Sequence, residues 1–134
     1  MLYNITTGYN GLQKTPQQDI VVFVTSLHTL REQEVEFVFT DRHAYVQAAQ
    51  FSGDMQHLDR IDWEILRRRN FNRDPDDPGK CERYQAESLI HRLVPVSALL
   101  AIANYGPDQA ARLSELVASL SLETKVITRR EWYF

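Results

Sequence analysis

The most informative stretch of the sequence is Lys80-Cys81-Glu82-Arg83-Tyr84-Gln85-Ala86-Glu87-Ser88-Leu89-Ile90-His91. As a β-strand, this stretch places alternate side chains on two faces, because successive residues of a strand point to opposite sides. One face then carries Arg83, Gln85, Glu87, Leu89 and His91. A carboxylate beside a cation, an amide and an imidazole is typical of a strand that lines a polar cleft. The pattern favours an enzyme with Glu87 in that cleft, and the alternative is an exposed glutamate on a half-solvated strand.

The size and composition of the chain are those of one globular domain. It has 134 residues, a formal net charge of -3 and ordinary hydrophobic and charged fractions. No apolar run approaches the length that a membrane-spanning helix needs, and Met1-Leu2-Tyr3-Asn4-Ile5 lacks the basic and apolar regions of a secretory signal. We therefore expect a single domain over residues 1–134, no membrane association and a cytoplasmic location.

The cysteine and histidine content argues against a metal centre. Cys81 is the single cysteine, which excludes an internal disulfide and a cysteine-based zinc site. The histidines His28, His57 and His91 have no ligand-like spacing to one another or to carboxylates. We expect no bound metal.

The charge pattern leaves nucleic-acid binding open. The net charge opposes a strongly basic surface. A local cluster is formed by Arg67, Arg68, Arg69 and Arg73, with Arg83 following. Asp74, Asp76 and Asp77 lie beside this cluster and can neutralise much of its field, so a solvated charged loop is the alternative.

Helical and strand patterns are intermixed. We expect strands over residues 20–24, 36–40 and 125–128 in addition to the Glu87 strand, the first of them covered on both faces. Helices are expected from Ser26 to about 33, over 42–51, within 55–69 and over 107–120, with a loop at 70–80. The closing Trp132-Tyr133-Phe134 is expected to pack on the body. Without a regular βαβ rhythm, these elements predict an α+β fold.

Two further residues have competing interpretations. His43 lies where the strand 36–40 meets the expected helix 42–51, so it is either an active-site base or donor, or a residue in the first turn of a helix capped by Asp41. Trp63, with Ile65 and Leu66 after it, is either a core residue or a platform on which bases stack.

Several segments, in order and over essentially the whole chain, resemble the DarT family. They are Met1-Leu2-Tyr3-Asn4-Ile5, Val22-Phe23-Val24-Thr25-Ser26-Leu27, Phe39-Thr40-Asp41-Arg42-His43-Ala44, Arg83-Tyr84-Gln85-Ala86-Glu87 and Trp132-Tyr133-Phe134. The resemblance implies an ADP-ribosyltransferase fold with a split, mostly antiparallel β core and surrounding helices. It also implies a bacterial toxin that takes NAD and transfers ADP-ribose onto thymine in single-stranded DNA, with a DarG-like macrodomain antitoxin as partner.

The resemblance assigns roles to individual residues. Glu87 matches the catalytic glutamate of the family, and His43 resembles an active-site histidine. The span from about His43 to Glu87 resembles the loop that holds the DNA substrate. On this basis Trp63 is expected near a base, and phosphate contacts are expected from Arg67, Arg68, Arg69, Arg73 and Arg83.

One departure from the family concerns the start of the chain. In the family the Met-Leu-Tyr segment lies well inside the sequence, and an upstream region carries a histidine-containing NAD motif and a catalytic arginine. This sequence begins at Met1-Leu2-Tyr3, so we expect the fold to lack its N-terminal part. An exposed apolar patch or homo-oligomer and weak or absent NAD binding would follow. The alternative function is therefore an inactive module that binds single-stranded DNA or the antitoxin.

Overall fold

The computed structural model describes residues 2–133, so predictions about Met1 and Phe134 lie outside the described residues. Two compact units make up the chain. The first combines the residues up to Thr29 with those from Val94 onward, and the second contains Leu30–Leu93. The prediction that residues 1–134 act as a single domain stays a prediction.

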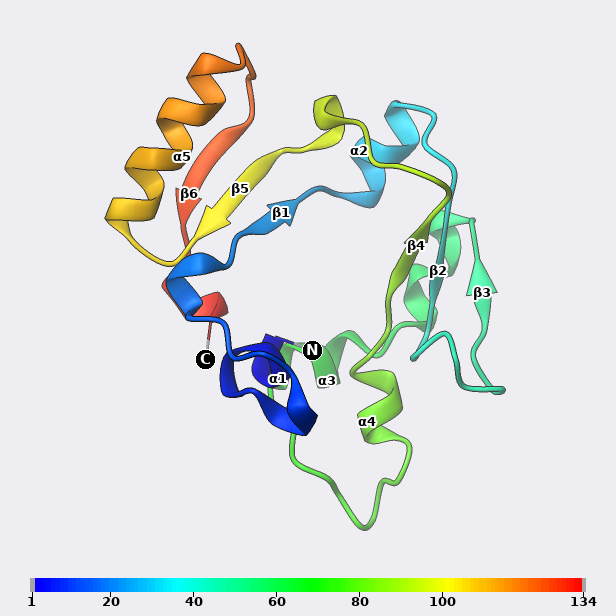
Figure 1. The fold of residues 1–134 in the computed structure, drawn as a ribbon. Coiled ribbons are helices and arrows are strands. Elements are labelled where there is room, and N and C mark those ends of the chain that lie inside the picture. Colours follow the sequence, from blue (N-terminus) through cyan, green and yellow to red (C-terminus); the bar gives the residue numbers. More distant parts are fainter. Residues whose placement is uncertain (1, 134) are drawn as a thin grey trace. The chain divides into compact units, whose positions relative to one another are not determined.

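The first unit is built on a three-stranded sheet of order β1-β5-β6. Strand β1 (Val22–Val24) is antiparallel to β5 (Ala101–Asn104), and β5 is parallel to β6 (Lys125–Thr128). Helix α5 (Pro107–Ser119) connects the two parallel strands and lies beside β6 (Figure 1). All four residues of β5 are buried, as expected for the central strand.

The predicted helix at 107–120 is confirmed. Pro107 stands in its first turn, where the missing N–H of proline has no intrahelical partner to lose. Its expected apolar face is only partly covered, because Val117 is buried whereas Leu116 and Leu120 are 53% and 59% exposed. The prediction that β1 is covered on both faces is wrong. Phe23 is 62% exposed, so one face of β1 is open, while Val22 and Val24 on the other face are partly covered.

Short helices complete the first unit. They are α1 (Leu2–Thr7) and the 3-10 helices η1 (Tyr9–Gly11), η2 (Gln17–Asp19), η4 (Val96–Ala98) and η5 (Arg130–Trp132). Of the closing aromatic residues, Tyr133 is buried and its hydroxyl lies 3.0 Å from the carbonyl oxygen of Ile20. Trp132 remains 38% exposed, so the expected packing is confirmed for Tyr133 alone.

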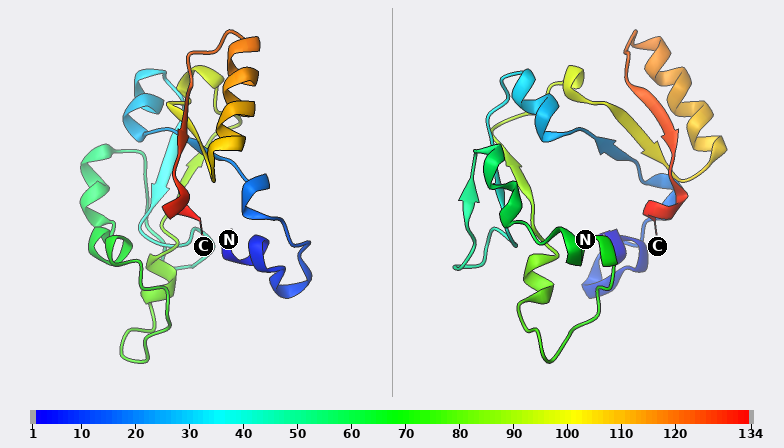
Figure 2. Two further views of the ribbon diagram at one scale, coloured as in Figure 1. Left: turned by 90° about the vertical axis from the view of Figure 1, so that its left-hand side faces the viewer. Right: turned by 180° about the vertical axis from the view of Figure 1, so that it is seen from behind.

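The second unit is built on an antiparallel sheet of order β3-β2-β4. Its strands are β2 (Phe37–Thr40), β3 (Phe51–Ser52) and β4 (Ser88–Ile90). Its helices are η3 (Met55–Arg60), α3 (Trp63–Arg68) and α4 (Lys80–Arg83), as Figure 2 shows from two further sides. Helix α2 (Leu27–Glu32) leads into this unit, and the predicted cap is confirmed because Ser26 Oγ accepts a hydrogen bond of 3.1 Å from the Thr29 N–H.

The prediction of one long strand from Lys80 to His91 is wrong in its first half. Lys80–Arg83 forms α4, because the carbonyl of Gly79 accepts hydrogen bonds from the N–H groups of Glu82 and Arg83. The strand starts only at Ser88, which pairs with Phe39. Because β2 ends at Thr40, the residues before Glu87 lie beyond the end of β2 and cannot pair with it.

The predicted helix over 42–51 does not form. Its cap would be Asp41, but the carboxylate of Asp41 accepts instead from the Gln50 N–H at 2.9 Å. The amide hydrogens that a cap would bind are also used elsewhere: the His43 N–H donates to the Glu82 carbonyl, and the Ala44 N–H donates to Glu87. The segment is therefore a series of turns that ends at β3.

Helices and mainly antiparallel strands are mixed in both units, which confirms the α+β class. Among the described helices, none is both long and apolar enough to cross a membrane. Some apolar surface is exposed: Val38 and Leu89, which are paired across β2 and β4, are 37% and 40% exposed.

Candidate active site around Glu87

Glu87 stands immediately before β4, in the second unit. Its carbonyl accepts a hydrogen bond of 2.9 Å from the Thr40 N–H, which extends the pairing of β2 and β4 by one residue. The side chain is 37% exposed, so it is neither buried nor free in solvent. The backbone of the candidate catalytic residue is therefore fixed by the end of the sheet.

One oxygen of the Glu87 carboxylate is fully engaged. Oε1 accepts a 2.9 Å hydrogen bond from the Ala44 N–H and lies 2.9 Å from His43 Nδ1. Because an ionised carboxylate oxygen only accepts, His43 Nδ1 carries the hydrogen in this contact. Within residues 2–133 no hydrogen bond is found to Oε2. The carboxylate thus keeps one oxygen for a ligand.

These contacts keep Glu87 ionised. The hydrogen bond from the Ala44 N–H is the largest influence and holds the pKa of Glu87 below its ordinary value of 4.5. The hydrogen bond from His43 lowers the pKa further, and both outweigh the opposing effect of burial. Glu87 therefore carries a full negative charge at neutral pH.

The turn that holds Glu87 is itself held by several contacts. The His43 N–H donates to the Glu82 carbonyl at 3.0 Å, and the Val46 N–H donates to the His43 carbonyl at 3.0 Å. Arg42 is paired with Asp41 at 3.0 Å. Burial raises the pKa of Asp41, but the hydrogen bonds from Gln50 and Arg42 together outweigh it and leave the pKa below its ordinary value. The sequence placed His43 near Glu87 only through the resemblance, and the structure brings the two into contact.

Two residues that the sequence did not indicate belong to this region. Thr40 is completely buried, and its hydroxyl accepts from the Glu87 N–H at 3.2 Å. Tyr45 directly follows Ala44 and is 92% exposed. A threonine at the end of a strand is common, so Thr40 gives no signal in the sequence. Tyr45 was obscured because the segment was expected to be a helix.

The candidate DNA-binding residues lie mainly on and after α3. Arg67 and Arg68 belong to α3, Arg69 and Arg73 follow it, and all four are exposed. Arg68 is paired with Glu64. Trp63 is 43% exposed, and its indole N–H donates to the Leu58 carbonyl at 2.7 Å. The interpretation of Trp63 as a core residue is therefore wrong, while its role near a base stays a prediction.

Arg83 binds two aspartates of its own chain. Its guanidinium lies 3.1 Å from Asp62 and 2.5 Å from Asp77. The hydrogen bond to Asp77 is the main cause that raises the pKa of Arg83, and the contact with Asp62 adds to it despite the effect of burial. The phosphate contact of Arg83 stays a prediction, and the structure shows that Arg83 joins Asp62, which caps α3, to Asp77 in the loop at 70–80.

The polar loop is also attached to the segment before Glu87. The Tyr84 hydroxyl accepts a 2.8 Å hydrogen bond from the Asn70 N–H, and the rings of Phe71 and Tyr84 are 4.9 Å apart. Tyr84 lies three residues before Glu87 in the sequence. The segment that follows α3 and the Glu87 carboxylate therefore belong to one connected region of the second unit.

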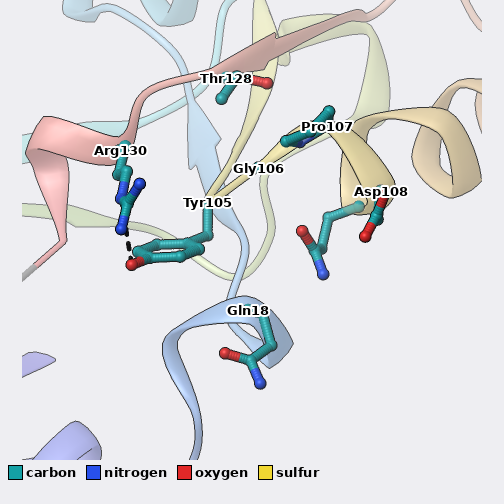
Figure 3. Close-up of a pocket in the computed structure, with 8 residues that line it drawn as sticks. Gln18, Tyr105, Gly106, Pro107, Asp108, Thr128 and Arg130 are labelled. Atoms are coloured by element: carbon teal, nitrogen blue, oxygen red, sulfur yellow. Dashed lines mark hydrogen bonds between the residues drawn. The ribbon is translucent and has the colours of Figure 1, made fainter.

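A separate hollow of about 480 Å³ belongs to the first unit (Figure 3). It is lined by Gln18, Tyr105, Gly106, Pro107, Asp108, Gln109, Thr128 and Arg130. Arg130 Nε donates to the Tyr105 hydroxyl at 3.1 Å, so its cation is already engaged. These lining residues do not include the residues that contact Glu87. Among residues 2–133 no group of three metal-ligating side chains is found either.

Comparisons with known proteins show which proteins this chain is similar to. A DNA ADP-ribosyl transferase of Escherichia coli O127:H6 is 42% identical over 134 residues, which are all of this chain and 62% of that protein. The chain therefore spans about three fifths of that relative. The structure of Thermus sp. 2.9 DarT in complex with NAD+ matches 99% of this chain and 66% of its own, with a TM-score of 0.84 and 26% identity.

A second solved structure of the same Thermus protein contains DNA. Thermus sp. 2.9 DarT in complex with ADP-ribosylated single-stranded DNA matches 99% of this chain and 63% of its own, again with a TM-score of 0.84. The expected ADP-ribosyltransferase fold is thereby confirmed. The family model described as the ssDNA thymidine ADP-ribosyltransferase DarT matches residues 1–134, and this chain belongs to the DarT family.

Proposed function

We propose that this chain takes part in NAD-dependent transfer of ADP-ribose onto thymine in single-stranded DNA, with Glu87 as its catalytic residue. The single observation that carries the proposal is the ionised Glu87 carboxylate, with Oε1 bound by Ala44 and His43 and Oε2 left for a ligand. Family membership and the NAD+ and DNA complexes of the Thermus relative support the choice of substrates.

The state of Glu87 favours one of two roles. As a substrate, NAD supplies the ADP-ribosyl group, and transfer replaces the bond from ribose to nicotinamide with one from ribose to a thymine nitrogen, which loses its proton. A carboxylate with a lowered pKa is a weak base, so Glu87 is poorly suited to take that proton. A fixed negative charge instead stabilises the positive charge that develops on the ribose, and Oε2 can accept a hydrogen bond from a ribose hydroxyl.

Neighbouring residues have roles that follow from their contacts. His43 orients Glu87 through Nδ1 and leaves Nε2 for a hydrogen bond with a ligand. Tyr45 offers an exposed ring one residue from the Ala44 amide that binds Glu87, which suits stacking on a base. Trp63 offers a partly exposed ring in the same unit. Phosphate contacts are assigned to Arg67, Arg68, Arg69 and Arg73, whereas Arg83 contributes through the loop.

Membership in the family supports a wider biological proposal. The chain would act in the cytoplasm as the toxin of a toxin–antitoxin pair, whose partner is a macrodomain that removes the modification. The exposed apolar side chains of Val38 and Leu89, paired across β2 and β4 of the second unit, offer a surface for contact with further protein, including a second copy.

A mass measurement tests the transfer directly. The chain is incubated with NAD and a thymidine-containing single strand, and the DNA is weighed with the E. coli relative as positive control. A gain equal to one ADP-ribosyl group, absent from an oligonucleotide without thymidine, supports the proposal. No gain from this chain, while the relative modifies the same strand, refutes transfer by these 134 residues.

A second candidate function is a module that binds single-stranded DNA without transfer. It is favoured by the exposed cations and ring of α3 and the residues after it, since such binding needs no NAD. Salt-dependent binding of a thymidine oligonucleotide, without any mass gain when NAD is added, would select this function.

A further inference from the structure

We infer that Thr40 is a positioning residue of this site, whose buried hydroxyl couples the backbone of Glu87 to the turn that binds the Glu87 carboxylate. The inference rests on the proposed function for its catalytic meaning. Its structural content, the coupling of the two segments, can be tested without any transfer reaction.

The hydroxyl of Thr40 joins two segments that are far apart in sequence. It accepts a 3.2 Å hydrogen bond from the Glu87 N–H and donates a 2.5 Å hydrogen bond to the Arg42 carbonyl. The Thr40 N–H also donates to the Glu87 carbonyl at 2.9 Å. Because the Thr40 side chain is completely buried, water does not replace these partners easily when the hydroxyl is removed.

These bonds form a closed circuit with the carboxylate. The Arg42 carbonyl belongs to the planar peptide unit that leads into His43, and the next peptide unit carries the Ala44 N–H. That N–H binds Glu87 Oε1 at 2.9 Å. Glu87 is therefore held at its main chain by Thr40 and at its carboxylate by the turn, and Thr40 fixes the separation between the two attachments. Oε2 then points in one direction rather than in several.

An ordinary explanation of Thr40 is that a β-branched residue suits the end of a strand and fills its space. The two explanations make different demands on the side chain. Filling space requires the shape of threonine, which valine keeps. Positioning requires a hydroxyl that accepts and donates at once, which serine keeps and valine lacks. The pair Thr40→Val and Thr40→Ser therefore separates the two explanations.

The first measurement follows the Glu87 carboxyl by carbon NMR as the pH is lowered, with the signal assigned from Glu87→Gln. In the wild-type chain the midpoint should lie below the ordinary 4.5, because Ala44 and His43 bind the ionised form. Among residues 2–133, the titratable and charged groups that face this part of the turn are His43, Arg42 with Asp41, and Glu82, and the variants leave all of them in place. Thr40→Val should move the midpoint toward the ordinary value, and Thr40→Ser should not.

The second measurement is the transfer reaction of the same proteins. Thr40→Val should lower kcat by about tenfold or more while the KM for NAD changes little, since a misplaced catalytic group affects the reaction more than binding. Thr40→Ser should recover most of kcat. If Thr40→Val does not fold, Thr40→Ala replaces it in both measurements, with Thr40→Ser again as the hydroxyl-bearing control.

The outcomes distinguish this inference from the proposed function. A midpoint in Thr40→Val equal to that of the wild type overturns the inference, whether or not the chain transfers ADP-ribose. A shifted midpoint together with an inactive wild-type chain supports the coupling and refutes transfer by these residues. Equal losses of kcat in Thr40→Val and Thr40→Ser would also overturn the inference, because the hydroxyl would then make no difference.

Discussion

Replacing Glu87 by glutamine removes the charge of the candidate catalytic residue and little else. The glutamine oxygen can still accept the hydrogen bonds from the Ala44 N–H and His43 Nδ1, both of which are 2.9 Å long in the structure. The NH2 group of the glutamine amide takes the place of Oε2. We therefore expect Glu87→Gln to fold normally, to bind DNA as the wild type does and to transfer ADP-ribose far more slowly.

The size of the loss follows from Coulomb's law. Two unit charges about 4 Å apart interact by about 1 kcal/mol in water and about 4 kcal/mol where the effective dielectric constant is near 20. The Glu87 side chain is 37% exposed without ligands, and bound DNA and NAD would cover part of that area. An interaction of about 2–4 kcal/mol is therefore expected, which corresponds to a reduction in kcat of about 30- to 1,000-fold.

The rate is measured from the mass gain of a thymidine oligonucleotide at saturating NAD. Glu82→Gln serves as the matched control, because Glu82 is a nearby carboxylate whose side chain lies 3.8 Å from Arg42 and makes no contact with His43 Nδ1 or the Ala44 N–H. The control should keep its activity within about threefold. A Glu87→Gln variant that retains a third or more of the wild-type kcat would refute the electrostatic role of Glu87.

Three further outcomes test other parts of the structure. The lowered pKa of Glu87 stabilises the fold above about pH 4.5, and this stabilisation is lost as the pH falls through the pKa that Glu87 has in the folded chain. The melting temperatures of wild type and Glu87→Gln should therefore converge at low pH. A difference in melting temperature that grows toward low pH would contradict this prediction. Leu30 is 1% exposed, so Leu30→Ala should lower the free energy of unfolding in urea by about 2–5 kcal/mol, against less than about 0.5 kcal/mol for Leu120→Ala at an exposed position. Replacing three arginines, Arg67, Arg68 and Arg69, by glutamine should reduce by about 2 the slope of log binding constant against log salt concentration for DNA. Arginine to glutamine at the exposed Arg112 of α5 should leave this slope unchanged. An unchanged slope in the triple variant would show that α3 is not part of the DNA site.

Elements with strong local signals could be predicted from the sequence. The helix after Gly106-Pro107-Asp108 and the strand at Glu36–Thr40 both formed near the expected positions, because proline, caps and alternation act locally. The strand over Lys80–His91 failed because its length is set by β2, a partner far away in sequence. The helix after Asp41 failed for the same reason, since Glu87 takes the Ala44 N–H that a helix cap would have used.

The site was predicted in part. Glu87 was proposed from its polar surroundings in the sequence and from the family likeness, and the structure adds its contact with His43, 44 positions away. Thr40 could not be found, because its importance depends on hydrogen bonds to Arg42 and Glu87 that appear only in the folded chain. The carboxylate partners of Arg83 were likewise invisible, since charge runs alone do not say which members pair.

The two aspartates on Arg83 have a consequence for how this fold can diversify. Asp62 and Asp77 both bind the Arg83 guanidinium, so the residues between them form a segment whose two ends are held together. Each doubling of the length of such a segment costs only about 0.6 kcal/mol in loop-closure entropy, as long as its two ends stay joined. Under the proposed function, insertions or exchanges within this segment would therefore change which single-stranded DNA is bound, while Glu87, which lies outside the segment, keeps its place. New DNA preferences can then arise by exchange of this segment alone, with the residues around Glu87 unchanged.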